Sequence, residues 1–240
     1  MTAEELQKKQ YKMHAKIKRH ANKEGLSKQK PICEPICDGV CDIAGYLETK
    51  PRIMWILKEP YDDFTVSGKA KGGAWSFTKH FKNEDVWKDE DMWKLIIQVN
   101  SAIHNDCKWK DLNYIEDDPN MAAELKKTAY INVGKMPGDT SSPKNHMLQC
   151  YQDWKEIILE QIDLYAPDVI IFGYTFYLFK EDLELNDSPV STIAGEWATD
   201  GYKKDNIIYI DAYHPSRKGG EDGGKDYVTS IVKTYKKLNS

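Results

Sequence analysis

Polar side chains suited to acid–base chemistry stand close behind short apolar runs of this sequence. Glu59 comes shortly after the run 53–57, and His214 comes shortly after the run 207–211. A carboxylate and an imidazole that converge on one cleft can support general acid–base or electrostatic catalysis of a hydrolysis. Further polar residues lie within or just after such runs: Asp62, Asp63, Asn132 and Ser216. The sequence therefore indicates a candidate hydrolytic site, provided that the fold brings these residues together.

Four apolar runs predict the strands that would position these residues. Each run is short, favours β structure, and stops at glycine, proline or polar residues, as buried parallel strands do. The runs cover residues 53–57, 129–133, 168–173 and 207–211. Because ligands of parallel sheets bind beyond the carboxyl ends of the strands, we expect the segments that follow the runs to converge on one face. These segments are 58–62, 134–138, 174–176 and 214–220.

Helical patterns separate the strands. They cover residues 3–24, 87–104, 144–165, 175–183 and 225–238. Strands that alternate with helices predict an α/β fold with three layers, α/β/α, around a central four-stranded parallel sheet. The length fits one domain, 1–240. Residues 1–50 would form an N-terminal helix and an extended connection, and residues 51–240 would form the α/β core.

The composition limits the classes of protein that this chain can belong to. Hydrophobic residues make up 40% and charged residues 30%, which is typical of folded soluble proteins. No run reaches the roughly 20 apolar residues of a membrane span, and the lysine-rich N-terminus lacks the apolar core of a signal peptide. We therefore expect a cytoplasmic protein without membrane contact.

The charge balance gives no overall sign of nucleic-acid binding. The net charge is −4, whereas phosphate binding usually leaves a basic footprint. Residues 1–31 carry a local basic excess, which a solvated helix face explains; a DNA contact is the alternative. Any contact with phosphates would have to be local.

The order of the loops and their amino-acid sequences resemble those of the uracil-DNA glycosylase superfamily. Residues 57–61 (Leu-Lys-Glu-Pro-Tyr) are similar to its water-activating motif, Gly-Gln-Asp-Pro-Tyr, and residues 214–216 (His-Pro-Ser) match its second signature. Residues 130–137 and 167–173 resemble the second and third strand segments of its iron–sulfur branch. The resemblance covers about residues 50–235 and implies the fold of that superfamily.

The resemblance also implies roles for particular residues. Glu59 stands where the catalytic carboxylate of the family positions water and stabilises a sugar cation, and His214 stands where a histidine donates to the uracil anion. The resemblance further implies base-binding residues: Tyr61 to exclude the thymine methyl, Asn132 to read the uracil edge, and Trp75 or Phe77 to stack on the flipped base. The residues implied to contact DNA are Ser216, Arg217 and Lys218.

Each of these residues also has a purely structural reading, and some depart from the family pattern. Glu59 could simply end a strand, His214 could be a surface loop residue, and Asn132 could satisfy backbone groups. The three aromatic residues could belong to the core. Leu57 and Lys58 replace Gly-Gln, which could narrow the pocket, and Lys58 could pair with Glu59.

The five cysteines are expected to be reduced thiols without a bound metal. The resemblance to the iron–sulfur branch leaves one alternative, because such clusters need four thiolates. Its candidate ligands would be Cys33, Cys37, Cys41 and Cys150, although their spacing differs from that branch and Met136 replaces one of its cysteines.

Together, these observations lead to one leading functional hypothesis. The chain would be a hydrolase, a DNA N-glycosylase that removes uracil or another damaged base during base excision repair. It would act as a monomer on DNA, with neither metal nor redox cofactor. The alternative is an altered member of the superfamily that binds nucleic acid, a free base or a nucleotide without turnover. A nucleotide hydrolase is less favoured, because no phosphate-cradling glycine loop follows the first strand.

Overall fold

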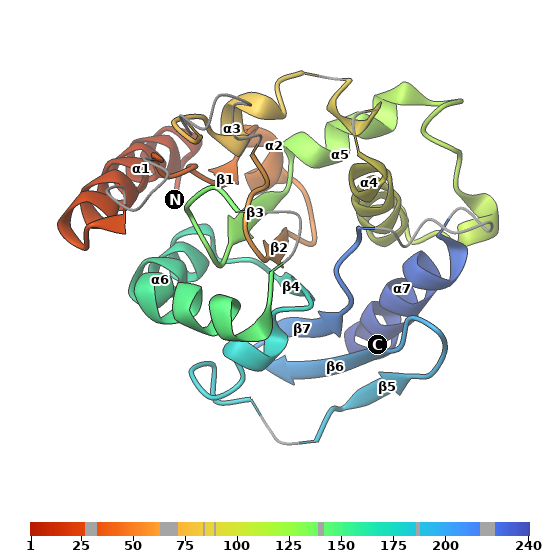
Figure 1. Cartoon of the computed structure of the whole chain (residues 1–240). Helices are drawn as coiled ribbons and strands as arrows, with labels where there is room; N and C mark the ends of the chain where they lie inside the picture. Colours follow the sequence, from red (N-terminus) through yellow and green to blue (C-terminus); the bar gives the residue numbers. More distant parts are fainter. Residues whose placement is uncertain are drawn as a thin grey trace.

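Four parallel strands form the centre of the structure, a computed structural model that describes residues 1–26, 33–62, 72–83, 85–88, 90–138, 142–185, 188–216 and 224–240. The four predicted apolar runs supply these strands. In order across the sheet they are β3 (Ala129–Asn132), β2 (Ile53–Leu57), β4 (Val169–Gly173) and β7 (Ile207–Ala212) (Figure 1). Every residue of β2, β3 and β4 is buried, as expected for strands that are covered on both faces.

The sheet is larger and more mixed than the sequence predicted. Its seven strands in the described ranges follow the order β1-β3-β2-β4-β7-β6-β5. The three additional strands pair antiparallel at the edges: β1 (Gly39–Val40), β5 (Ser191–Ile193) and β6 (Thr199–Lys204). The four predicted strands are thus parallel, as expected, but three antiparallel strands that the sequence did not predict extend the sheet.

The sequence analysis did not predict strand β6, because its residues are mostly polar. It forms a hairpin with β7, and the turn uses two residues with positive φ, Asp205 (50°) and Asn206 (67°). Such consecutive left-handed residues, often Asn or Asp, are typical of two-residue hairpin turns. Within β6, Gly201 lets α7 (Lys225–Asn239) approach, because a Cβ at this position would lie 2.5 Å from Thr234 Cγ2.

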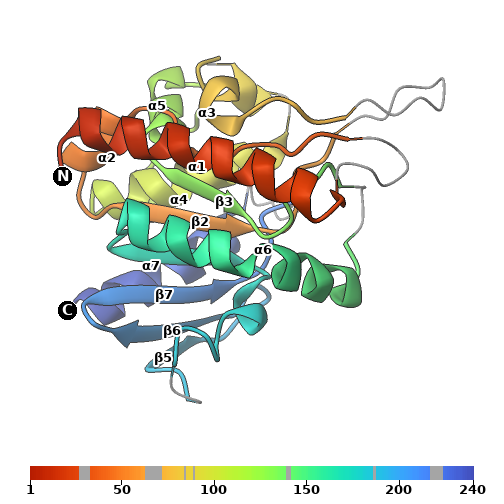
Figure 2. The ribbon, with the colours of Figure 1, turned by 90° about the vertical axis from the view of Figure 1, so that its left-hand side faces the viewer.

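Helices cover both faces of the sheet, which confirms the predicted three layers. One face carries α1 (Ala3–Lys23), α2 (Ile43–Glu48) and α6 (Lys144–Tyr165), and Figure 2 shows α1 and α6 in front of the strands and running roughly along them. The other face carries α3 (Phe77–His80), α4 (Asp91–His104), α5 (Ala123–Lys126) and α7. Alternate residues of β2 serve the two cores: Met54 packs toward α6, and Trp55 packs toward α4. None of the described helices is long and apolar enough to span a bilayer.

The helix predicted at 175–183 does not form. The chain has only the 3₁₀ turn η5 (Phe176–Leu178) here, followed by further turns. Tyr174 adopts a positive φ of 61°, and its N–H donates to the carbonyl groups of Phe172 and Ala212. Tyr174 is thus tied to the ends of β4 and β7, and the chain continues from it in turns rather than in a regular helix. The other 3₁₀ turns are η2 (Val86–Lys88), η3 (Trp109–Asp111) and η4 (Pro119–Ala122).

A buried ion pair joins the segment before β1 to the segment after β3. Lys135 Nζ lies 2.6 Å from Asp38 Oδ2, and both side chains are fully buried. Asp38 also accepts hydrogen bonds from the backbone N–H of Asn132 and from Gln161 Nε2 of α6, each at 2.7 Å. Burial lowers the pKa of Lys135, and the facing Asp38 carboxylate opposes that shift. Hydrogen bonds to both carboxylate oxygens thus offset the cost of burying the two charges.

Removing one partner of this pair should destabilise the protein strongly. Lys135→Met leaves Asp38 buried with an uncompensated charge, and we expect it to lower the free energy of unfolding by about 3–5 kcal/mol. Lys8→Met, which removes the exposed ion pair with Glu4, is the control and should cost less than about 1 kcal/mol. Urea denaturation measures both changes. Equal effects of the two substitutions would contradict a structural role for the buried pair.

A partly buried carboxyl group, Asp211, makes stability depend on pH. Burial raises the pKa of Asp211 in β7 to about 7, and the negative charge of Asp200 adds to the shift. These two residues face each other across the β6–β7 pair. Between pH 4 and 7, the Asp211 carboxyl therefore keeps its proton in the folded chain. In the unfolded chain, where the pKa of an aspartate is about 4, that proton has already been released. Stability falls as the pH rises through this window.

Asp211→Asn should remove this pH dependence. We expect the variant to melt at a higher temperature than the wild type at pH 8 and to show a smaller difference at pH 5. Asp163→Asn, at an exposed position of α6, is the control and should show no such trend. Thermal unfolding at several pH values tests this, and a difference between wild type and Asp211→Asn that is constant with pH would refute it.

Candidate functional site

A cavity of about 990 Å³ opens at the carboxyl ends of the four parallel strands. Leu57 at the end of β2, Asn132 at the end of β3, Tyr174 after β4 and Tyr213 after β7 all contribute to its wall. This volume lies within the range of cavities that hold small organic ligands. The convergence expected from the sequence is therefore present, and Leu57 does not close the pocket.

The cavity gathers the candidate residues that the sequence identified. Seven of them line it: Glu59, Tyr61, Trp75, Phe77, Asn132, His214 and Ser216. Two other candidates, Arg217 and Lys218, lie outside the described residues, as does Asp63. Asp62 supports the wall, because its Oδ2 accepts hydrogen bonds from Gly73 N–H (2.6 Å) and Trp75 Nε1 (3.2 Å).

Glu59 is held in place by contacts on both of its carboxylate oxygens. Its side chain is 5% exposed. Ser142 donates from Oγ to Oε1 at 2.7 Å, and His146 Nε2 lies 2.7 Å from Oε2. The neighbouring Lys58 places its Nζ 5.0 Å from the centre of the Tyr174 ring. Glu59 is therefore more than the end of a strand: it is a buried carboxylate with a defined orientation at the cavity wall.

Two glycines of the loop after β3 make room for this carboxylate. A Cβ at Gly138 would lie 2.3 Å from Glu59 Cγ, and a Cβ at Gly134 would lie 3.1 Å from Glu59 Cβ. The backbone N–H groups of both glycines donate to carbonyls of the Glu59 loop, at Lys58 and Pro60. The two loops are thus packed too closely for any larger residue at position 138.

His214 is held in the tautomer that donates from Nε2. The Ser216 backbone N–H donates to His214 Nδ1 at 3.2 Å, which requires that Nδ1 be unprotonated. In the neutral ring the proton then sits on Nε2. The loop is fixed at its start by Tyr227 Oη of α7, which donates to the Tyr213 carbonyl at 2.8 Å. His214 therefore presents a neutral N–H donor.

Asn132 is a buried amide at the base of the cavity. Only 3% of the residue is exposed, and it stands beside Leu57 in the register of β2 and β3. Its backbone N–H already donates to Asp38. Within the described residues its side-chain amide forms no hydrogen bond. The side chain therefore does not bond to backbone groups, which was the structural alternative for Asn132. An amide offers both a donor and an acceptor to a ligand.

The aromatic candidates differ in how far they belong to the core. Phe77 is 6% exposed and packs in a cluster with Phe81 and Trp93, with ring centroids 5.5 and 6.0 Å away. Trp75 is half-buried, lies 4.8 Å from the Phe77 ring, and is oriented by Asp62. Tyr61 is 49% exposed. Phe77 is therefore a core residue with one side on the cavity, whereas Trp75 and Tyr61 are more accessible to a ligand.

The sequence analysis missed several residues of this site. The cavity is also lined by His80, Glu90, Met92, Trp93, Ser142 and Tyr213, none of which the sequence identified, and by Tyr174 of the segment 174–176 that was expected there. His146 was missed as a partner of Glu59, and so was Cys150, whose Sγ lies 3.5 Å from His146 Nε2. One signal could have found them: α6 begins shortly after the loop that follows β3, so its first turns lie at the same end of the sheet.

The cysteines do not converge as a four-thiolate cluster requires. Cys37 is buried in the core on the α1 side of the sheet, and Cys41 packs against the core on the opposite side. Among the described residues, the one group of three or more metal-type ligands with atoms within 4.8 Å of one another is Glu59, His146 and Cys150. These positions do not fit an iron–sulfur cluster held by Cys33, Cys37, Cys41 and Cys150.

Comparisons with known proteins give no match: neither the protein-family models nor the curated proteins include one that this chain matches.

The close packing of Glu59 against Gly138 can be tested by a double-mutant cycle. Gly138→Ala should lower the free energy of unfolding by about 1–3 kcal/mol, because its Cβ overlaps with Glu59 Cγ. In a Glu59→Ala background, which lacks Cγ, the same substitution should cost much less. Urea denaturation of the four proteins gives the coupling energy. Additive effects would mean that the two residues do not touch.

Proposed function

We propose that this chain is a DNA glycosylase of the uracil-DNA glycosylase superfamily, which hydrolyses the N-glycosidic bond of uracil or another damaged base. One observation carries the proposal. Residues 59, 61, 75, 77, 132, 214 and 216, selected from the sequence because they resemble the motifs of that superfamily, line a single cavity. They come from segments up to about 150 residues apart, so the agreement is not a consequence of sequence proximity.

The chemistry of the reaction requires two unlike groups, and the cavity has both. Cleavage of an N-glycosidic bond leaves a sugar with cationic character and a base anion. The Glu59 carboxylate would stabilise the cation and position the attacking water. His214, neutral with its proton on Nε2, would donate to the base anion.

Base recognition would use the remaining wall of the cavity. Asn132 would offer its amide to the edge of the base, and Trp75 would provide a stacking surface backed by Phe77. Extruding a base from the duplex costs on the order of a few kcal/mol, which such contacts offset. Cations at the rim would contact phosphate: Lys58 and Lys144 both lie over the Tyr174 ring.

A second candidate function is binding of nucleic acid or a free base without turnover. It is favoured by one feature of the site, the contacts on both oxygens of Glu59. A carboxylate that is fully engaged with Ser142 and His146 has less capacity to hold a water molecule. In this case, the cavity would recognise a base while the reaction itself would not proceed.

An oligonucleotide cleavage assay separates the two functions. Substrates carry a single uracil, hypoxanthine or xanthine, and alkali converts abasic sites to strand breaks. We expect wild type to release at least one of these bases, and Glu59→Gln and His214→Ala to be slower by about 10²–10⁴-fold. Glu156→Gln, an exposed glutamate of α6, is the matched control and should keep the wild-type rate.

The outcome that would contradict the glycosylase proposal is equally defined. Folded wild-type protein that yields no abasic product from any of the lesions would rule against it. Binding of the same oligonucleotides, measured by fluorescence anisotropy and unchanged in Glu59→Gln, would then support the binding function.

A further inference from the structure

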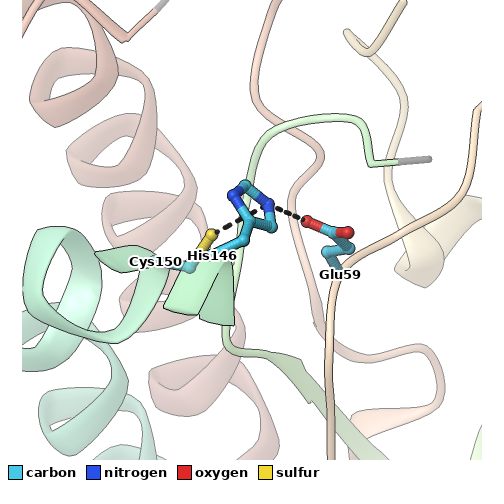
Figure 3. Close-up of side chains that lie close together, drawn as sticks. All are labelled: Glu59, His146 and Cys150. Atoms are coloured by element: carbon cyan, nitrogen blue, oxygen red, sulfur yellow. Dashed lines mark hydrogen bonds and ion pairs between the residues drawn. The ribbon is translucent and has the colours of Figure 1, made fainter. Parts of the chain in front are cut away.

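Three side chains next to the cavity point toward one another in a way that the proposed reaction does not explain. Glu59 comes from the loop after β2, and His146 and Cys150 come from successive turns of α6 (Figure 3). A carboxylate oxygen, an imidazole nitrogen and a thiol sulfur all lie within 4.8 Å of one another. The spacing of four residues places His146 and Cys150 on the same face of the helix.

A network of hydrogen bonds alone does not account for this geometry. His146 directs the same atom, Nε2, toward Glu59 Oε2 at 2.7 Å and toward Cys150 Sγ at 3.5 Å. One ring nitrogen carries at most one proton, so it cannot donate fully to both neighbours. A cation placed between the three atoms would instead be shared by all of them.

A cysteine–histidine–glutamate catalytic triad is also a poor explanation. In such a triad the nucleophile and the carboxylate contact different nitrogens of the histidine ring, whereas here both face Nε2.

We propose that Glu59, His146 and Cys150 form a binding site for a divalent cation of borderline softness, with Zn²⁺ as the preferred ion. Thiolate, imidazole and carboxylate are the ligand types of protein zinc sites, and three protein ligands leave a fourth position for water. Tetrahedral Zn–N and Zn–S bonds imply a separation of roughly 3.5 Å between nitrogen and sulfur. The observed separation of 3.5 Å between His146 Nε2 and Cys150 Sγ agrees with this value. The 2.7 Å between His146 Nε2 and Glu59 Oε2 is a hydrogen-bond distance, and it has to lengthen when both atoms ligate the ion.

The surroundings of the three ligands support the site. Ser142 donates to the Glu59 oxygen that does not face His146, as an outer-shell partner orients a ligating carboxylate. His146 is 52% exposed on its side chain, which gives an ion an entry path from solvent. On binding, the Cys150 thiol releases its proton to solvent and ligates as a thiolate, which neutralises part of the charge of the ion.

Metal titration of the reduced, metal-free protein tests the site directly. Zn²⁺ is added in competition with a chromophoric chelator, and Co²⁺ is used as a spectroscopic probe of thiolate ligation. We expect one equivalent of Zn²⁺ per chain and a sulfur-to-cobalt charge-transfer band in the wild type. His146→Ala and Cys150→Ser should each weaken Zn²⁺ binding by about 100-fold or more, and Cys150→Ser should abolish the charge-transfer band.

Cys107→Ser is the matched control, because Cys107 is also a half-buried free cysteine but lies outside this group. It should bind Zn²⁺ as the wild type does. The absence of saturable binding in the wild type would overturn the proposal, and so would equal affinities in the Cys150→Ser and Cys107→Ser variants. The titration uses no DNA, so its result does not depend on whether the protein cleaves DNA.

One consequence rests on the proposed glycosylase function. A Glu59 carboxylate that ligates Zn²⁺ is withdrawn from the attacking water, so zinc-loaded wild type should cleave damaged DNA about 10²-fold or more slowly than zinc-free wild type. Equal rates of the two forms, with Zn²⁺ shown to be bound, would refute this inhibition and leave the metal site standing.

Discussion

The buried pair of Asp38 and Lys135 fixes the geometry on which the site depends. Asp38 binds Lys135, the backbone of Asn132 and the side chain of Gln161, and its carbonyl oxygen contacts His14 of α1. Asp38 thus connects the segment that leads into strand β1, the end of β3, and helices α1 and α6. Burying an ion pair away from water costs free energy unless every polar group in it has a hydrogen-bond partner. This network therefore allows few alternative arrangements of the elements that it joins.

The position of Glu59 follows from that arrangement. Lys135 lies between Gly134 and Gly138, the two glycines whose small size admits the Glu59 side chain. The same loop leads into α6, which supplies His146 on the far side of the carboxylate. The ion pair does not line the cavity, but it anchors the loop whose glycines admit the side chain of Glu59.

Glu59 is shared between two neighbouring sites, and this sharing links the two proposals. On one side it lines the cavity with His214 and Asn132, where a base would bind. On the other it contacts His146 and, through it, Cys150. A single carboxylate can either hold water for hydrolysis or ligate a cation. The structure thereby offers a physical means by which zinc availability would control a glycosylase.

The charge of the chain is compatible with a nucleic-acid partner only through local features. The net charge is −4, yet Lys58 and Lys144 gather around Tyr174 at the cavity rim. Tyr174, Tyr177 and Tyr213 are each more than a third exposed. Cations beside accessible aromatic rings are suited to phosphates and bases of a flexible strand.

The sequence by itself determined the elements whose signal is local. The apolar runs became β2, β3, β4 and β7, and the helix predicted at 144–165 has those bounds in the structure, because burial of one helix face or of a whole strand leaves a regular pattern in neighbouring residues. It also identified the loops that meet at the cavity. Strand β6, which pairs with β7 and β5, is mostly polar and left no such pattern, and the helical pattern at 175–183 did not produce a helix. Only the tertiary structure decided the contacts of Glu59 with His146 and of Asp38 with Lys135, which join residues 87 and 97 positions apart. Such pairs depend on how separate elements pack together, and no local pattern of residue types records that packing.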